Sequence, residues 1–254
     1  MLLRALLVIV MLLQGSVAFA SEMNVQTVPL ERNNVKLHLL NIQQKDSNAG
    51  KPLLMVHGLT YSSHEFDVNY GDYSLARFFA SQGYSVWLLD IAGYGSSQQV
   101  DDGFMPNSDY AAEDIAAAAR LILEKSGQKT LDVLGWSWGT VTSGRFAAKY
   151  PEMVRKLVLY APIVAGLGAF DVTVAYNHNT WEHAAGDFQV KEDKTIDNEI
   201  TEQPVVDTFQ SNCWRYDGES SPNGGRRDLL VDGAKRLIPT ASIKAPTLII
   251  VGDK

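Results

Sequence analysis

Short apolar runs alternate with amphipathic stretches along most of this chain. The runs lie at residues 53–56, 85–89, 131–134 and 157–160, and they are mostly apolar rather than strictly alternating. Runs of that length and composition are typical of strands that are buried on both faces of a sheet. We therefore expect four central strands, each separated from the next by one or more other elements.

The stretches between these runs carry helical spacing and recognisable ends. Residues 74–82 place apolar side chains at helical intervals and stop at Gly83, which tolerates a left-handed cap. A longer helix is predicted over residues 109–124, with Ser108 as its N-cap and Gly127 after its end. Residues 140–150 form a third helix-like stretch before Pro151.

The first part of the chain shows a different pattern, in which apolar and polar positions alternate. Residues 24–30 and 35–42 alternate on either side of the turn-prone Arg32-Asn33-Asn34, which is typical of a hairpin. We expect this hairpin to form the antiparallel edge of the sheet. Strands alternating with helices predict an α/β fold with a doubly wound, mostly parallel sheet.

The alternation disappears between residues 162 and 239, which predicts an inserted lid. This stretch mixes a polar run with aromatic residues that include Phe170, Tyr176, Trp181, Phe188, Trp214 and Tyr216. The fold then resumes with an apolar run at residues 247–251 that predicts one more buried strand. The expected organisation is a signal peptide at 1–20, the core at 21–161 and 240–254, and the lid at 162–239.

Composition narrows the class of protein. The 254 residues are 46% hydrophobic and 20% charged, which is ordinary for a globular domain and excludes disorder. A formal charge of -7, without a dense Lys/Arg cluster, argues against nucleic acid or an anionic membrane surface as a partner. The chain has no Cys-x-x-Cys, no His-x-x-x-His and no calcium-loop spacing, so we expect no metal and no cofactor.

The first twenty residues predict export. Arg4 precedes an apolar run at 5–13, and Ala18-Phe19-Ala20 offers a small-x-small cleavage pattern before Ser21. An uncleaved N-terminal anchor is the alternative. With cleavage we expect no stable membrane anchor and a location in a bacterial periplasm or outside the cell. The single cysteine, Cys213, cannot form an internal disulfide and reads as a half-buried structural thiol.

The most informative motif is Gly135-Trp136-Ser137-Trp138-Gly139, which lies between the predicted strand 131–134 and the helix-like stretch 140–150. A serine presented from a sharp strand-to-helix turn adopts a strained backbone, and side chains two residues away on either side would collide. Gly135 and Gly139 fit that steric need. The pattern therefore predicts a nucleophile elbow with Ser137 at its tip.

Four landmarks in order resemble the α/β-hydrolase family, in its lid-bearing branch. They are His57-Gly58, Asp90 with the glycine-rich turn at 93–96, the elbow at 135–139, and Ala245-Pro246 before the last strand. The resemblance implies that Ser137 is the nucleophile and that the backbone N–H groups of Leu59 and Trp138 form the oxyanion hole. Fixed donors there stabilise the negative charge of acyl transfer, each by about 3 kcal/mol.

The resemblance also places the rest of the triad, and here the chain departs from the pattern. The acid should follow strand 247–251, just beyond Lys254, which leaves Asp253 as a second candidate. The catalytic histidine should come later still, and none of the five histidines of the chain (His38, His57, His64, His178 and His183) fits that place. We expect a C-terminally truncated hydrolase that lacks the last strand and helix, has an uncovered edge at 247–251, and turns over little substrate.

Three functions stay open. The first is an exported serine hydrolase (carboxylesterase or lipase) that acts on small-molecule esters. The second is an aminopeptidase for short peptides, because Trp138 resembles proline iminopeptidase relatives, although residues 57–60 lack their His-Gly-Gly-Pro-Gly segment. The third is a non-catalytic binding protein of the same fold. Relatives with an alkyl-enzyme ester, such as epoxide hydrolases, carry aspartate at the elbow, so serine argues against that chemistry.

Overall fold

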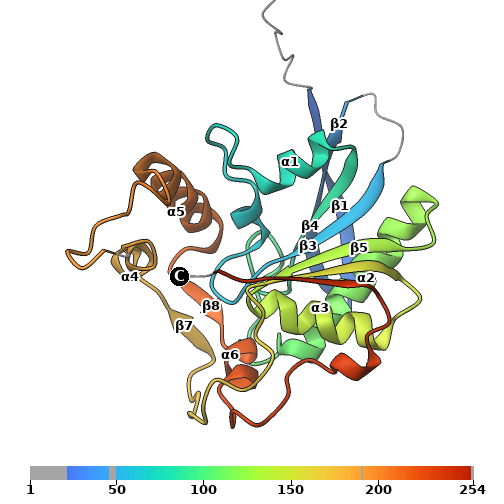
Figure 1. The fold of residues 1–254 in the computed structure, drawn as a ribbon. Coiled ribbons are helices and arrows are strands. Elements are labelled where there is room, and N and C mark those ends of the chain that lie inside the picture. Colours follow the sequence, from blue (N-terminus) through green and yellow to red (C-terminus); the bar gives the residue numbers. More distant parts are fainter. Residues whose placement is uncertain (1–21, 46–49, 190, 253–254) are drawn as a thin grey trace, which may run out of the picture.

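The fold is built on one twisted sheet of seven strands in the order β1-β2-β4-β3-β5-β6-β9 (Figure 1). The computed structural model describes residues 22–45, 50–189 and 191–252. The strands β4, β3, β5, β6 and β9 run parallel, whereas β1 and β2 are antiparallel at one edge. The strand bounds are β1 Met23–Arg32, β2 Val35–Gln44, β3 Lys51–Val56, β4 Tyr84–Asp90, β5 Leu131–Trp136, β6 Val154–Tyr160 and β9 Thr247–Ile250. The predicted mostly parallel sheet and its antiparallel hairpin are confirmed.

Helices cover both faces of this sheet. Helix α1 (Leu75–Ser81) packs on one face, and helices α2 (Ser108–Ser126) and α3 (Trp138–Lys149) pack together on the other (Figure 1). Strand β3 contributes to the apolar clusters on both faces of the sheet, because its successive side chains point to opposite faces. Leu53 and Met55 join the apolar cluster under α1, whereas Leu54 and Val56 join the larger cluster under α2 and α3.

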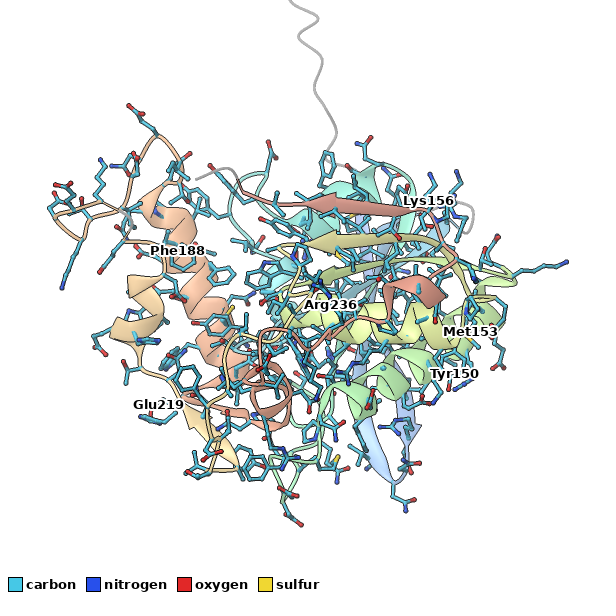
Figure 2. The ribbon with its side chains drawn as sticks, turned by 60° about the horizontal axis from the view of Figure 1, so that its bottom comes forward. Tyr150, Met153, Lys156, Phe188, Glu219 and Arg236 are labelled. Carbon is cyan, nitrogen blue, oxygen red and sulfur yellow. The ribbon has the colours of Figure 1, made fainter. Side chains whose placement is uncertain are left out.

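Most of the segment between β6 and β9 lies to one side of the sheet, whereas its last part runs back along α3 (Figure 1). In Figure 2 its Phe188 and Glu219 lie on the side opposite Tyr150, Met153 and Lys156. The segment contains β7 Tyr176–His178, α4 Trp181–Gly186, α5 Gln203–Asp217, β8 Ser220–Pro222, α6 Gly224–Leu229 and, after the predicted lid, the short helix η2 Thr240–Ser242. That this segment acts as a lid over the active site remains a prediction.

Two local predictions are wrong. The N-cap of α2 is Asn107, whose side chain accepts from the N–H groups of Asp109 and Tyr110, so Ser108 is instead the first helical residue. The burial predicted from the apolar run of β9 is also wrong, because Leu248 and Ile249 are 57% and 58% exposed. The expected uncovered edge at 247–251 is present, since β9 is the last strand of the sheet.

The predicted export signal at 1–20 lies outside the described residues. Within the described residues, none of the helices has both the length and the apolar character that crossing a bilayer demands.

Candidate active site

Ser137 lies at the tip of a sharp turn between β5 and α3, at the carboxyl edge of the central strands. Its backbone has φ 53° and ψ -119°, a left-handed conformation that L-residues rarely adopt. A hydrogen bond from its N–H to the carbonyl oxygen of Tyr160 (3.0 Å) ties the turn to β6. The geometry is the strained strand-to-helix turn that the sequence predicts.

Gly135 and Gly139 are required by close backbone contacts around this turn. A β-carbon on Gly135 would lie 2.2 Å from the carbonyl oxygen of Gly139. One on Gly139 would lie 2.3 Å from the carbonyl oxygen of Val56, at the end of β3. Both distances are far inside van der Waals contact, so any larger residue would force the elbow and β3 apart.

The segment after β3 lies directly beside the serine. A β-carbon on Gly58 would be 3.7 Å from Ser137 Oγ, so the side-chain-free Gly58 leaves room next to the hydroxyl. Trp138 is the first residue of α3, and the N–H groups of a first helical turn have no acceptor within the helix. The two segments that hold the predicted donors, Leu59 and Trp138, therefore flank Ser137.

Buried polar contacts fix both of these segments. Trp138 is fully buried, and its indole N–H donates to Ser108 Oγ (2.9 Å). The Gly58 N–H donates to Glu65 Oε1 (3.2 Å). The hydroxyl of Tyr94 lies 3.2 Å from the carbonyl oxygens of both Leu59 and Pro222, and donates to one at a time. These contacts hold the backbone beside Ser137 in place before any substrate binds.

His57 is close to the elbow but is not free to act as a base. Its Nε2 accepts from the N–H of Ile91 (3.1 Å), so Nδ1 carries the proton and donates to the carbonyl oxygen of Gly58 (2.8 Å). The ring is fully buried, and burial lowers the pKa of His57. Both nitrogens of this neutral ring are used to shape the segment that contains Leu59.

The other four histidines also lie away from the serine hydroxyl. His38 and His64 face Asp90, His178 on β7 is exposed, and His183 lies in α4. Within residues 22–45, 50–189 and 191–252, no histidine is hydrogen-bonded to Ser137 Oγ. Asp253, the second candidate for the acid, lies outside the described residues.

Asp90 organises the turn after β4. Its Oδ1 accepts from the N–H and hydroxyl of Ser63, and its Oδ2 accepts from the N–H of Ser96 and from His38 Nδ1 (3.1 Å). Burial alone would raise the pKa of Asp90, but the hydrogen bond from His38 and the charge of His64 lower it to about 2. The Asp90 carboxylate therefore ties the glycine-rich turn to Ser63 and to β2.

Helix α5 reaches the same region with a second, partly buried carboxylate, Asp217, which the sequence did not single out. Asp217 Oδ2 accepts from the N–H and hydroxyl of Ser62 (both 2.9 Å), and Oδ1 accepts from the N–H of Gly95 (3.0 Å). Burial, assisted by the negative charge of Asp90, raises the pKa of Asp217 to about 7. The end of α5 thus ties together the loops that follow β3 and β4.

Burial also raises the pKa values of two residues near Asp217, namely Glu65 and Cys213. It raises the pKa of Glu65 well above its usual range, although the hydrogen bond from Gly58 opposes the shift. Burial likewise raises the pKa of the Cys213 thiol. Cys213 is free and fully buried rather than half-buried, which suits a structural thiol and leaves no reactive thiolate.

The structure also brings together His38, His64 and Asp90, although the sequence predicted no metal site. Nδ1 of His38, Nε2 of His64 and an Asp90 carboxylate oxygen all lie within 4.8 Å of one another. The three residues belong to β2, to the short helix η1 (Ser63–Phe66) and to β4. Motif spacing could not reveal such a cluster, because only the sheet and its connections bring these elements together.

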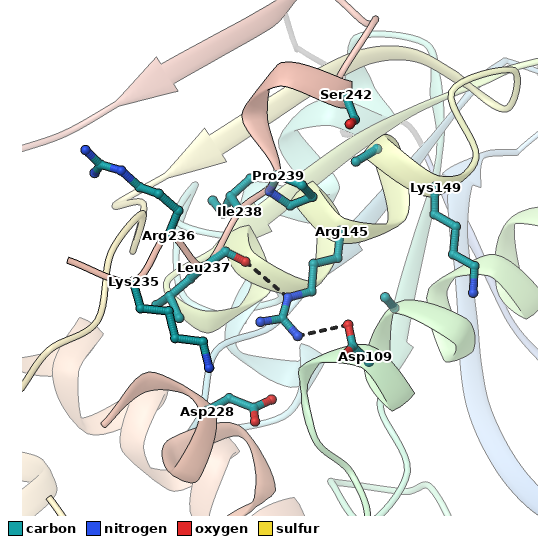
Figure 3. A pocket seen from close by; sticks show the side chains of 12 residues that line it. Asp109, Arg145, Lys149, Asp228, Lys235, Arg236, Leu237, Ile238, Pro239 and Ser242 are labelled. Atoms are coloured by element: carbon teal, nitrogen blue, oxygen red, sulfur yellow. Dashed lines mark hydrogen bonds and ion pairs between the residues drawn. The ribbon is translucent and has the colours of Figure 1, made fainter. Parts of the chain in front are cut away.

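A hollow of about 820 Å³ lies elsewhere, between α2, α3 and the segment 235–242 (Figure 3). The guanidinium of Arg145 lines it and is already paired, because it donates to Asp109 Oδ1 (2.9 Å) and to the carbonyl oxygen of Leu237 (3.1 Å). Neither Ser137 nor either predicted oxyanion donor lines this hollow. It is therefore not the predicted catalytic site.

Comparison with known proteins agrees with this architecture. The family described as the alpha/beta hydrolase fold matches residues 51–198, and the chain belongs to this family. The thioesterase domain from the curacin biosynthetic pathway shares the fold, with a TM-score of 0.60 at 16% sequence identity over 91% of this chain and 84% of that one.

Two curated relatives are similar in sequence. The poly(3-hydroxyalkanoate) polymerase subunit PhaC of Haloferax mediterranei is 32% identical over 60% of this chain and 30% of its own length. Lipase member K of Mus musculus is 34% identical over 41% of this chain and 28% of its own length. The matched part of the chain thus spans less than a third of either relative.

Proposed function

We propose that this chain carries the nucleophile and oxyanion hole of a serine hydrolase that cleaves carboxylic esters through an acyl-enzyme on Ser137. The observation that carries the proposal is the strained backbone of Ser137 at the start of α3. Strain of about 1–3 kcal/mol persists only where the surroundings enforce it, and such residues cluster at functional sites. A binding protein has no need of that turn.

Charge stabilisation supports acyl transfer at this position. The N-terminus of α3 carries a partial positive charge, and the Trp138 N–H belongs to its unsatisfied first turn. An oxyanion formed at Ser137 would accept hydrogen bonds from the N–H groups of Trp138 and Leu59. Gly58 has no side chain and so leaves the space beside Ser137 Oγ free. Preorganised donors of this kind are commonly the largest contribution to catalysis of acyl transfer.

The similarity to a lipase supports an ester substrate. A small-molecule ester is therefore the proposed substrate, ahead of a short peptide. We further propose export, with cleavage after Ala20, on the pattern of the first twenty residues alone.

No described histidine contacts Ser137, so we expect this chain to be acylated slowly and deacylated more slowly. Serine hydrolases that lose a triad member keep a rate enhancement of roughly 10³–10⁴ over water from the oxyanion hole and substrate binding. With a p-nitrophenyl ester, nitrophenolate release should show a burst of one equivalent per chain, followed by a slow phase. An amino-acid anilide should give no burst.

The test compares Ser137→Ala with Ser81→Ala, which alters an exposed serine on α1. We expect the burst to disappear in Ser137→Ala and to persist in Ser81→Ala. An equal burst in both variants, or a burst with the anilide but not with the ester, would refute the ester hydrolase. Circular dichroism of each variant checks that the fold is kept.

A further inference from the structure

Three side chains with metal-ligand chemistry converge beside the loop that follows β3. His38 comes from β2, His64 from η1 and Asp90 from the end of β4. Asp90 Oδ2 lies 3.1 Å from His38 Nδ1 and 3.7 Å from His64 Nε2, and the three ligand atoms lie within 4.8 Å of one another. Two imidazoles and one carboxylate form a donor set that suits divalent transition metals.

His64 supplies an independent sign that something binds there. Its Nε2 is buried and has no hydrogen-bond partner among the described residues, and the whole residue is only 8% exposed. Buried polar atoms of native proteins nearly always have a hydrogen-bond partner. An atom without one therefore either binds a ligand or ion, or lowers the stability of the fold. His57 shows the contrast, because both of its ring nitrogens are used.

The surroundings hold His64 ready as a ligand. Its ring stacks on Tyr216, with 3.4 Å between centroids and 9° between planes, which fixes its orientation. Asp90 is held as well, because its Oδ1 accepts from the N–H and the hydroxyl of Ser63. Two of the three side chains are therefore fixed before an ion binds.

We propose that His38 Nδ1, His64 Nε2 and Asp90 Oδ2 bind one zinc ion. Zinc bonds of about 2.0–2.1 Å in a tetrahedron place ligand atoms roughly 3.3 Å apart. The separations of 3.1 and 3.7 Å lie on either side of that value. The ion replaces the hydrogen bond between His38 and Asp90, and His38 then binds with Nδ1 unprotonated.

With three protein ligands, a water molecule would complete the tetrahedron. The ion joins β2, β4 and η1, and η1 belongs to the loop that also contains Gly58 and Leu59. Its main effect is therefore to stabilise the fold beside the elbow. This inference does not depend on the chemistry proposed for Ser137.

Zinc titration of the untagged, metal-free chain tests the proposal. Isothermal titration calorimetry should give one zinc ion per chain, and Co²⁺ in the same site should give the visible absorption bands of tetrahedral nitrogen and oxygen ligation. His64→Phe keeps a ring to stack on Tyr216 but removes the ligand, and His38→Gln removes the second. Each should weaken zinc binding at least about tenfold and abolish the rise in Tm that zinc gives the unaltered chain.

His178→Phe is the matched control, because His178 is a histidine on β7 with a side chain 69% exposed. Its zinc affinity should equal that of the unaltered chain. The proposal is overturned if the unaltered chain retains no stoichiometric zinc, or if His178→Phe loses as much affinity as His64→Phe. If His64→Phe does not fold, His38→Gln decides, because full zinc affinity in that variant is equally contradictory.

Discussion

The conformation of Ser137 depends on what its neighbours lack. Its φ of 53° costs an L-residue about 1–2 kcal/mol, and the turn closes only because Gly135 and Gly139 have no side chains. The sequence could predict both glycines because this steric need is local. It could not show that Gly139 also packs against the end of β3, which depends on the order of the strands.

Gly135→Ala should therefore destabilise the fold. Its β-carbon would lie 2.2 Å from the Gly139 carbonyl oxygen, a backbone atom that cannot move alone. We expect the free energy of unfolding to fall by about 3 kcal/mol, in the range of severe overpacking. In Gly186→Ala the new β-carbon meets nothing within 4 Å. Urea denaturation should show that control unchanged or more stable; similar losses in both would contradict the account.

Ser108→Ala tests the support under Trp138. The change leaves the indole N–H of a fully buried Trp138 without its acceptor. An unsatisfied buried donor costs about 1–3 kcal/mol, so the free energy of unfolding should fall by that amount. Ser81→Ala, at an exposed site, serves as the reference in the same denaturation series. No difference between the two variants would show that this hydrogen bond has little net effect.

At the scale of elements, periodicity predicted the strands and helices of the sheet well. It failed where tertiary contacts decide the outcome. Asn107 and Ser108 are both residue types that favour the N-cap position, and Asn107 occupies it. Ser108 instead donates its N–H to Asp228 and accepts the indole N–H of Trp138 at its hydroxyl. The apolar run of β9 predicts burial, yet its place at the edge leaves it exposed. The cluster of His38, His64 and Asp90 joins three separate elements and has no signature in the sequence.

The attachment of α5 to the core should depend on pH through Asp217. Its pKa rises from 3.8 in an unfolded chain to about 7 in the fold. A raised carboxyl pKa gives stability that is fully present below about pH 4 and is lost as the pH rises to about 7. The shift of about 3 pKa units corresponds to a loss of about 4 kcal/mol in the free energy of unfolding.

Asp217→Asn cannot ionise, so its Tm should fall less than that of the unaltered chain between pH 4.5 and pH 7.5. Asp207→Asn changes an exposed carboxylate on the same helix and should keep the original pH dependence. Identical profiles for Asp217→Asn and the unaltered chain would contradict the assigned pKa. Asp90, with a pKa of about 2, contributes in the opposite direction and only in acid.

At the largest scale, β9 forms one edge of the sheet within the described residues. Strand β9 exposes Leu248, Ile249 and Ile250 by 41–58%, together with the free hydrogen-bonding groups of an edge strand. Exposed apolar edges are templates for pairing between chains. We expect this chain to associate with increasing concentration through β9.

Ile249→Lys should reduce this association, because a charge on an edge strand opposes pairing. Val25→Lys makes the same change on β1 at the opposite edge, where Val25 is 45% exposed, and should have a smaller effect. Light scattering across a concentration series measures both variants. Association that persists unchanged in Ile249→Lys would place the contact elsewhere.

The central claim is that Ser137 is an acylating nucleophile held in its reactive conformation by the fold. Peptide mass mapping after reaction with a p-nitrophenyl ester tests it most directly. We predict one acyl group per chain, located on the peptide that contains Ser137 and absent from Ser137→Ala, with Ser81→Ala acylated normally. An unmodified Ser137 in a folded chain, or an acyl group that persists in Ser137→Ala, would contradict the account.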